Sequence, residues 1–152
     1  MKILVIQLTR PGDIFCTGPV LNAIRDRNPE AEIHLAVRKK FQDAARNLKA
    51  IDRLWTLDSE KWMGPLLYDS SDFSAPIYEL SKVINNLKDE KFDTVINLSF
   101  SPSSSFMTFL VAQPTTTVLG YSRTQDFYLH IPDSVSRYIK AQVGLGRPNK
   151  IH

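Results

Sequence analysis

The sequence predicts an α/β domain built on a Rossmann-like, doubly wound parallel β-sheet, and three observations support this fold class. Apolar, β-branched runs recur along the chain, the first at residues 2–8, as expected of parallel strands that are buried on both faces. Segments with helical spacing separate these runs. Turns that contain Pro or Gly mark several of the boundaries. Strands that alternate with helices are typical of a parallel sheet covered by helices on both faces.

Composition indicates one cytoplasmic domain. The chain has 152 residues, of which 43% are apolar, and this is enough for a conventional core. The net charge of +3 gives only a mild bias toward anionic partners, and we expect no nucleic-acid partner. Cys16 is the only cysteine, so we expect no internal disulfide and a reducing compartment. We find neither a signal peptide nor a run of about 18 apolar residues.

The first strand and its turn organise the predicted domain. Residues 2–8 read as a buried strand, a polar turn closes on Gly12-Asp13, and a helix runs from there toward Asn28. The turn therefore lies at the carboxyl edge of the sheet, where open α/β sheets bind their ligands. Asp13 is the only acidic residue in this turn, which makes it the leading candidate for chemistry.

The next elements follow in order. Residues 32–37 read as the second strand, because they alternate or run apolar, and Arg38-Lys39-Lys40 opens a helix that reaches Leu48. Residues 53–57 form a short third strand. Residues 58–76 carry no clear period and read as a long irregular loop, a feature that is often functional. Pro76 then opens a helix whose apolar positions share one face, at Ile77, Leu80, Ile84 and Leu87.

The last third repeats the pattern. Residues 94–98 read as a strand and 99–105 as its Ser-rich turn, which opens at the same sheet edge as Asp13. An apolar helix at 106–112 and a short strand at 116–119 follow. Asp133-Ser134 then caps a short helix.

Specific residues resemble a known family, glycosyltransferase family 9, the ADP-heptose:lipopolysaccharide heptosyltransferases. The matching positions, in chain order, are Ile3-Leu4-Val5, Gly12-Asp13, Pro19-Val20-Leu21, Pro29, Ala31, Ile33, Leu35, Val37-Arg38, Phe92-Asp93, Val95-Ile96-Asn97-Leu98 and Gly120-Tyr121. The match at Gly12-Asp13 and Pro19 is the most specific part. The chain departs from the family at Gln7, at Pro11 and at Ser99-Phe100-Ser101, where its members often have a basic residue, an apolar residue and Gln-Gly.

The resemblance implies a GT-B enzyme of roughly twice this length, in which two Rossmann-like domains face each other across a cleft. Residues 1–152 would be the N-terminal, acceptor-side domain, and the C-terminal donor-binding domain would be absent from this chain. The implied reaction is inverting transfer of a sugar from a nucleotide sugar such as ADP-heptose to a lipopolysaccharide-core or related glycan acceptor in bacteria. We expect this domain alone to be inactive, and we expect peripheral contact with the cytoplasmic face of the inner membrane.

Asp13 has two interpretations. The family places an aspartate here as the base that takes the proton from the attacking hydroxyl. Asp13 is also suited to cap the first helix, which contributes about 0.5–2 kcal/mol. The two roles are compatible, because a helix amino terminus stabilises an ionised carboxylate.

The candidate acceptor-binding residues surround Asp13 in the predicted fold. They are Thr9, Arg10, Gly12, Lys61, Asn97, Ser99 and Ser101. Arg10 has the planar fork that holds a carboxylate or phosphate, but it also reads as a solvated loop arginine. The serines can donate to sugar hydroxyls or simply form the turn and cap the next helix. Arg38, Lys39 and Lys40 form a candidate patch for an anionic head group, or an exposed helical turn.

Other chemistries lack a sequence signal. Cys16 reads as a small buried hydrophobe rather than a nucleophile. His34, His130 and His152 are isolated and the chain has no DxD pair, so we expect no metal and no cofactor, with the nucleotide sugar as donor substrate. The alternative function is a non-catalytic Rossmann-like module that binds a nucleotide or phosphorylated ligand at the same edge.

Overall fold

A five-stranded parallel sheet lies at the centre of the computed structural model, which describes residues 1–67 and 72–144. The strand order is β3-β2-β1-β4-β5, and all four pairings are parallel. The strands are β1 (Lys2–Ile6), β2 (Glu32–Arg38), β3 (Arg53–Leu57), β4 (Thr94–Asn97) and β5 (Thr117–Gly120). The predicted doubly wound parallel sheet is confirmed.

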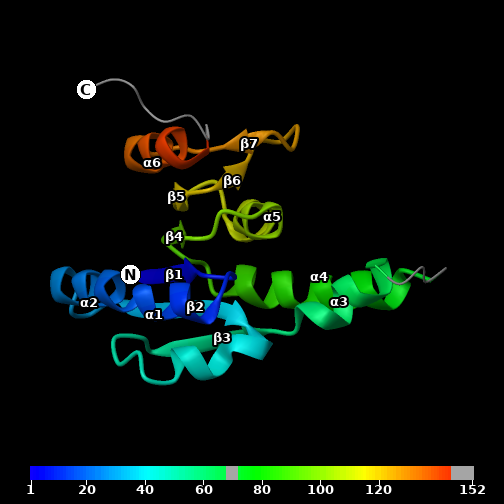
Figure 1. Ribbon diagram of the computed structural model, residues 1–152, viewed down its shortest axis with the longest axis horizontal. Coiled ribbons are helices and arrows are strands. Elements are labelled where there is room, and N and C mark those ends of the chain that lie inside the picture. The colour runs from blue at the N-terminus through cyan, green and yellow to red at the C-terminus, as the bar shows by residue number, and fades with distance from the viewer. Residues whose placement is uncertain (68–71, 145–152) are drawn as a thin grey trace.

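The order of the strands creates one topological switch point. The chain moves outward from β1 to β2 and β3, then returns to place β4 on the other side of β1 and continues to β5 (Figure 1). The carboxyl ends of β1 and β4 therefore lie next to each other while their connections leave in opposite directions. Open α/β sheets bind their ligands in the crevice at such a point.

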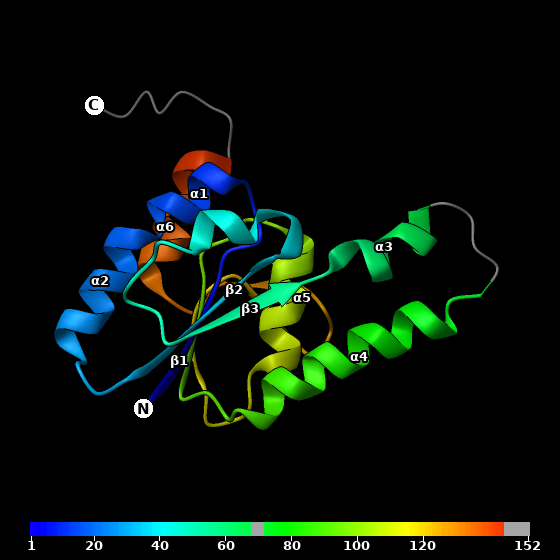
Figure 2. The ribbon, with the colours of Figure 1, turned by 90° about the horizontal axis from the view of Figure 1, so that it is seen from below.

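Helices cover both faces of the sheet (Figure 2). Their bounds are α1 (Pro11–Cys16), α2 (Gly18–Arg27), the 3₁₀ helix η1 (Lys39–Ala45), α3 (Ser59–Leu67), α4 (Ser74–Asp89), α5 (Pro102–Val111) and α6 (Ser134–Gly144). Between β5 and α6, the two-residue strands β6 (Ser122–Arg123) and β7 (Leu129–His130) form an antiparallel hairpin. In the described part of the chain, no helix is long and apolar enough to span a membrane.

The side chains of successive β1 residues pack into two separate hydrophobic cores, one on each face of the sheet. Leu4 and Ile6 pack with α3, α4 and α5, whereas Ile3 and Val5 pack with α1, α2 and η1. This division follows from the strand geometry, since neighbouring side chains point to opposite faces. Burial of each large aliphatic side chain contributes about 1.5–3 kcal/mol. The strand is thus fixed from both sides, and its carboxyl end has a defined position.

The predicted first helix is two helices, with a break at Thr17. Pro19 has no N–H, and its ring would collide with the carbonyl of Phe15 in a continuous helix. The Thr17 amide bonds the Ile14 carbonyl, and the Thr17 hydroxyl donates to the Asp13 carbonyl at 2.9 Å. The break therefore leaves the Asp13 carbonyl satisfied.

The prediction of an irregular segment at 58–76 is wrong for most of its length. Residues 59–67 form α3 and α4 begins at Ser74, while 68–71, including Asp69, lie outside the described residues. Buried Trp62 packs α3 against the core. The α3–α4 pair extends away from the sheet (Figure 2).

The helix after β4 begins four residues earlier than predicted. Ser101 is its N-cap, and the Ser101 hydroxyl accepts the Ser104 amide at 3.2 Å. Pro102 follows as the first helical residue, where its missing N–H costs nothing. The Ser-rich stretch is therefore the first turn of α5 rather than a loop.

Candidate functional site

The loops after β1 and β4 are joined at the switch point by buried hydrogen bonds. The Leu8 amide donates to the Ser99 hydroxyl at 2.7 Å, and that hydroxyl donates to Gln7 Oε1 at 3.0 Å. Gln7 and Ser99 are only 5% and 0% exposed. The structure therefore brings together two segments that lie about ninety positions apart in sequence, as the parallel topology predicts.

Asp13 lies at this edge in the first turn of α1, with its side chain exposed. Its carboxylate accepts the Arg10 backbone amide at 3.2 Å. A hydrogen bond from the Thr9 side chain, together with that amide, holds the pKa of Asp13 below its ordinary value. Among the described residues it forms no ion pair, so the carboxylate is ionised at neutral pH and open to a ligand. Asp13 lies on open surface and does not line the cavities described below.

Thr9, Arg10 and Gly12 lie in the same turn as Asp13, and their contact with an acceptor remains a prediction. The Thr9 hydroxyl has one proton and two acceptors near it, Asp13 and Gln7 Oε1, the latter at 2.6 Å. Arg10 and Gly12 are exposed. A Cβ added to Gly12 would meet nothing within 4 Å, which indicates free space above the first turn of α1.

Asn97, Ser99 and Ser101 belong to one hydrogen-bond network. Asn97 is 3% exposed, its amide nitrogen donates to the Tyr121 carbonyl at 2.8 Å, and its oxygen accepts the Ser99 amide at 2.9 Å. Because the polar atoms of Asn97 and Ser99 are buried and already paired, they fix the shape of the edge. Their direct contact with an acceptor remains a prediction. Ser101 is half-buried and caps α5, so its hydroxyl lies nearer the surface.

Lys61 lies elsewhere on the sheet edge. It is exposed in the first turn of α3, which follows β3, and β2 separates β3 from β1. Strands lie about 4.8 Å apart, so β3 is about 10 Å from the switch point. Lys61 is therefore placed to contact only a ligand that extends along the edge.

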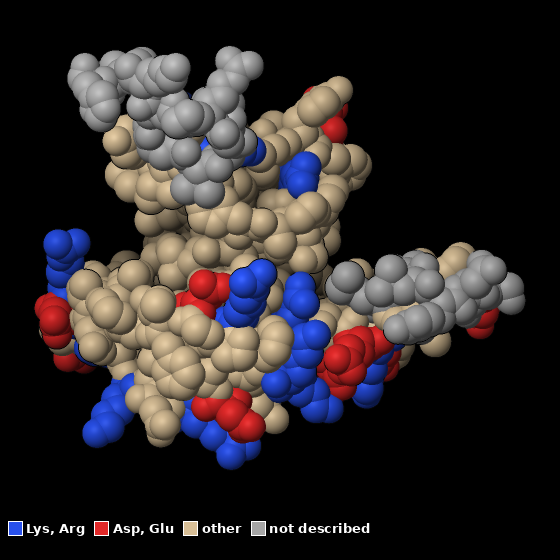
Figure 3. Space-filling model, viewed as in Figure 1, with Lys and Arg blue, Asp and Glu red and all other residues tan. Residues whose placement is uncertain are grey.

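The three residues of the predicted cationic cluster, Arg38, Lys39 and Lys40, each have different surroundings. Arg38 ends β2, Lys39 pairs with Asp58 at 2.9 Å, and Lys40 lies 5.1 Å from the centre of the Phe41 ring. Figure 3 shows Lys and Arg side chains gathered on the lower part of this face, below a largely uncharged band. The predicted helix is the 3₁₀ helix η1, which ends at Ala45 rather than Leu48.

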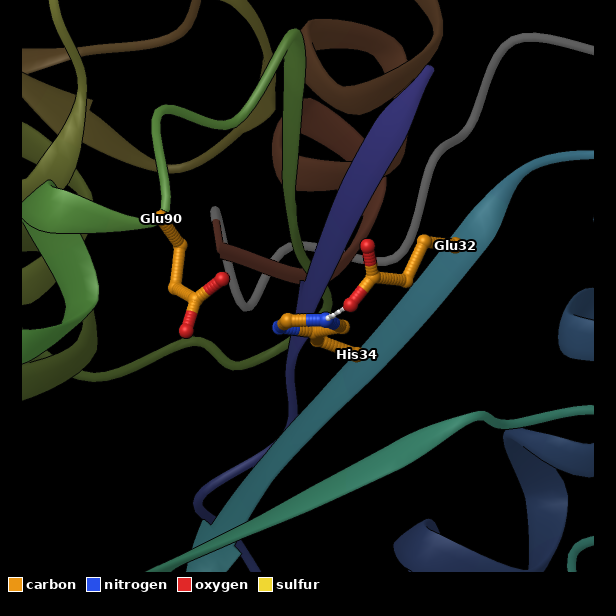
Figure 4. A group of neighbouring side chains, drawn as sticks. All are labelled: Glu32, His34 and Glu90. Carbon is orange, nitrogen blue, oxygen red and sulfur yellow. Dashed lines mark hydrogen bonds and ion pairs between the residues drawn. The ribbon is translucent and has the colours of Figure 1, made fainter.

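At the opposite, amino end of the sheet, three potential metal ligands meet: Glu32, His34 and Glu90 (Figure 4). Sequence spacing could not show this, because Glu90 follows α4. His34 Nε2 bonds Glu32 at 2.7 Å and its Nδ1 accepts the Trp55 indole N–H at 3.0 Å. The carboxylates also pair with Lys2 and, at Glu90, with Arg53. The cluster is therefore already satisfied by protein groups, and metal independence remains a prediction.

Two further residues were not predicted correctly from the sequence. The environment of Cys16 was predicted wrongly, and the role of Gln7 was not predicted. Cys16 is exposed, so the expectation of a buried hydrophobe is wrong; the short α1 turns that side chain toward the surface. Gln7 was noted only as a departure from the family, yet it is a buried centre of the hydrogen-bond network at the edge. A polar residue inside an apolar strand run is the signal that could have identified it.

Fold and site together define a class: a Rossmann-like α/β domain that presents an ionised carboxylate just after β1, at the switch point of the sheet. Comparison with known proteins shows which proteins of this class the chain resembles. No known protein-family profile matches the chain. It is similar to the lipopolysaccharide heptosyltransferase 1 of Campylobacter coli, with 39% identity over 57 residues, which is 38% of this chain and 17% of that protein.

Solved structures share the fold over more of the chain. A glycosyltransferase family 9 protein from Veillonella parvula superposes with a TM-score of 0.64 at 24% identity, covering 80% of this chain and 32% of that one. The E. coli heptosyltransferase WaaC with ADP-2-deoxy-2-fluoro heptose superposes with a TM-score of 0.62 at 17% identity, covering 98% and 50%. This chain thus spans half or less of the relatives it matches. The resemblance to glycosyltransferase family 9 is confirmed, and its structural neighbours are heptosyltransferases.

Proposed function

We propose that this chain is the N-terminal, acceptor-side domain of a two-domain GT-B glycosyltransferase that transfers a sugar with inversion. The observation that carries the proposal is the exposed, ionised carboxylate of Asp13 at the switch point between β1 and β4. The heptosyltransferase relatives support it. The donor is a nucleotide sugar such as ADP-heptose, held by a second domain, and the acceptor is a lipopolysaccharide-core or related glycan.

Asp13 acts as the base in the proposed reaction. As an acceptor hydroxyl oxygen bonds to the anomeric carbon, its proton passes to the carboxylate, and the bond to the nucleoside diphosphate breaks on the opposite face of the sugar. Inversion follows because attack and departure take place on opposite faces. A positioned base of this kind typically contributes about 10²–10⁴-fold to the rate.

The neighbouring residues position the acceptor. Arg10 offers a guanidinium to an anionic group on the glycan, and the free space over Gly12 admits the sugar. Thr9 and Ser101 supply hydroxyls on either side, and Lys61 contacts an extended acceptor. Asn97 and Ser99 contribute through the shape of the edge that they hold. The reaction uses no metal and no cofactor, and it takes place in the cytoplasm at the inner face of the membrane.

The test needs the longer protein. The coding sequence past His152 is read and the complete protein is assayed with nucleotide sugars, alongside its Asp13→Ala variant. We expect a second Rossmann-like domain, transfer by the complete protein, no transfer by residues 1–152, and loss of turnover in Asp13→Ala with an unchanged circular dichroism spectrum. A stop codon after His152, together with nucleotide binding by this chain, would favour the non-catalytic module instead.

A further inference from the structure

An apolar cavity of about 420 Å³ opens beside the switch point and has no role in the proposed proton transfer. Its floor consists of buried side chains and its mouth of the more exposed Phe106 and Leu110. The buried members are Leu8, Leu57, Trp62, Ile84 and Met107. The cavity therefore joins the loop after β1, the end of β3 and the helices α3, α4 and α5.

Arg38 is the charged residue that lines this cavity, and Ser59 and Ser103 are its other polar residues. Within residues 1–67 and 72–144, Arg38 makes no ion pair, whereas Lys39 next to it pairs with Asp58 and Arg25 pairs with Asp52. Arg38 is half-buried, and its guanidinium has no counter-charge among the described residues. An anion at the rim would supply the counter-charge that the described residues do not.

An apolar cavity with an arginine among its lining residues fits one class of ligand. The volume lies within the range of about 300–1,000 Å³ that small-molecule sites occupy, and such sites pair apolar walls with a few placed polar groups. A sugar would leave its hydroxyls unpaired against these walls, at a cost for each one. A free inorganic anion would leave the apolar floor exposed to water. An alkyl chain that ends in an anion satisfies both parts.

We propose that this cavity binds a single-chain anionic amphiphile, with the chain against Trp62, Ile84 and Leu110 and the head group on Arg38. The head group is a phosphate or carboxylate, since either accepts two parallel hydrogen bonds from a guanidinium. Binding is a property of this chain alone. That the amphiphile forms part of the acceptor rests on the proposed function, and places its anionic end at the same edge as Asp13.

Trp62 supplies the readout. Residues 1–152 are titrated with dodecyl phosphate, dodecanoate, dodecanol and inorganic phosphate below the concentrations at which the amphiphiles form micelles, and tryptophan fluorescence is recorded. We expect saturable one-to-one changes with both anionic amphiphiles, about tenfold weaker binding of dodecanol, and no change with inorganic phosphate. The tighter of the two anions identifies the head group.

Two pairs of variants test the parts of the site. Arg38→Gln should reduce the affinity for dodecyl phosphate to that for dodecanol, while Lys40→Gln, in the same cationic cluster but away from the cavity, should leave it unchanged. Leu110→Glu at the mouth should abolish binding, and Ile77→Glu, which is exposed on α4 outside the cavity, should not.

Equal binding of dodecanol and dodecyl phosphate, or an Arg38→Gln variant that binds like the wild type, would overturn the proposal. So would the absence of any saturable change. These outcomes are independent of sugar transfer, because no donor is present. Conversely, an inactive complete protein with intact amphiphile binding would refute the proposed function alone.

Discussion

Glu32 and Glu90 at the amino end of the sheet differ from Asp13 at the carboxyl end in what surrounds them. At the amino end of the sheet, Lys2 pairs with Glu32 and Glu90, Arg53 pairs with Glu90, and His34 hydrogen-bonds Glu32, and these interactions hold strands and the end of α4 together. At the carboxyl end, Asp13 bonds a backbone amide and a hydroxyl and faces solvent. The first arrangement stabilises the fold, and the second leaves a negative charge available for chemistry.

The interactions of Asp52 lead to a prediction of how the folding stability of the domain changes at acid pH. Its carboxylate accepts the Ile33 amide at 2.7 Å and pairs with Arg25, and these interactions lower its pKa, the amide bond most strongly. The ionised Asp52 carboxylate therefore contributes its full stabilisation at pH values above its pKa in the unfolded chain, about 3.9. This stabilisation is lost as the pH falls through the lower pKa that Asp52 has in the folded domain. Urea unfolding between pH 2 and pH 6 should show a weaker pH dependence for Asp52→Asn than for the wild type. Asp43→Asn, which changes an exposed carboxylate, serves as control.

The backbone conformation of Gly120 leads to a second prediction about the stability of the domain. Its φ is +86°, and a Cβ there would lie 2.1 Å from the Asn97 carbonyl oxygen. A non-glycine residue in such a conformation costs about 1–3 kcal/mol before any clash. Gly120→Ala should therefore lower the free energy of unfolding by at least this amount in urea melts. Gly12→Ala, in open space on a helix, should stabilise by about 0.5–1 kcal/mol, and an equal loss in both would contradict the assignment.

At the scale of elements, the two loops at the switch point act as one unit because Ser99 joins them. Ser99→Ala would leave the buried Leu8 amide without its acceptor, which costs about 1–3 kcal/mol. We expect that loss in denaturant unfolding. Ser103→Ala, an exposed change in the same stretch, should stay within about 0.5 kcal/mol of the wild type. Similar stability of the two variants would show that the loops are not coupled through Ser99.

Elements with a strong period or composition could be predicted from the sequence, and those set by long-range contacts could not. The predicted strands at 53–57 and 94–98 and the helix with Ile84 and Leu87 follow from local apolar patterning and are present, the second strand ending at Asn97; Ile77, predicted on the same apolar face, is instead 60% exposed. Among the α3 side chains that the structure describes, Trp62 is the buried one, and α3 also contacts α4, so its local sequence reads as a loop.

The same distinction holds for the candidate site. The position of Asp13 follows from the strand-turn-helix pattern, because such a turn must lie at the carboxyl edge. The burial of Asn97 and Ser99 depends on Gln7 and Tyr121, which are distant in sequence. Residue types alone predicted hydroxyl and amide donors there, but only the packing shows which of them are already used.

At the scale of the whole molecule, the β6–β7 hairpin and α6 carry a concentration of exposed apolar side chains. They include Phe127, Tyr128, Leu129, Val135, Tyr138 and Ile139. Exposed apolar patches of this kind promote association. Sedimentation velocity should show concentration-dependent self-association that Tyr138→Glu reduces. Tyr78→Glu is the matched control, since Tyr78 is 67% exposed and Tyr138 66%; an equal effect of both variants would exclude α6 as the interface.

The central claim is that Asp13 takes a proton rather than merely capping α1. Asparagine in its place keeps an oxygen that can accept the Arg10 amide but cannot take the proton. The most direct measurement is therefore the single-turnover rate of sugar transfer by Asp13→Asn in the complete two-domain protein. We expect a fall of about 10²–10⁴-fold with an unchanged circular dichroism spectrum. A rate close to that of the wild type would show that the carboxylate has only a structural role.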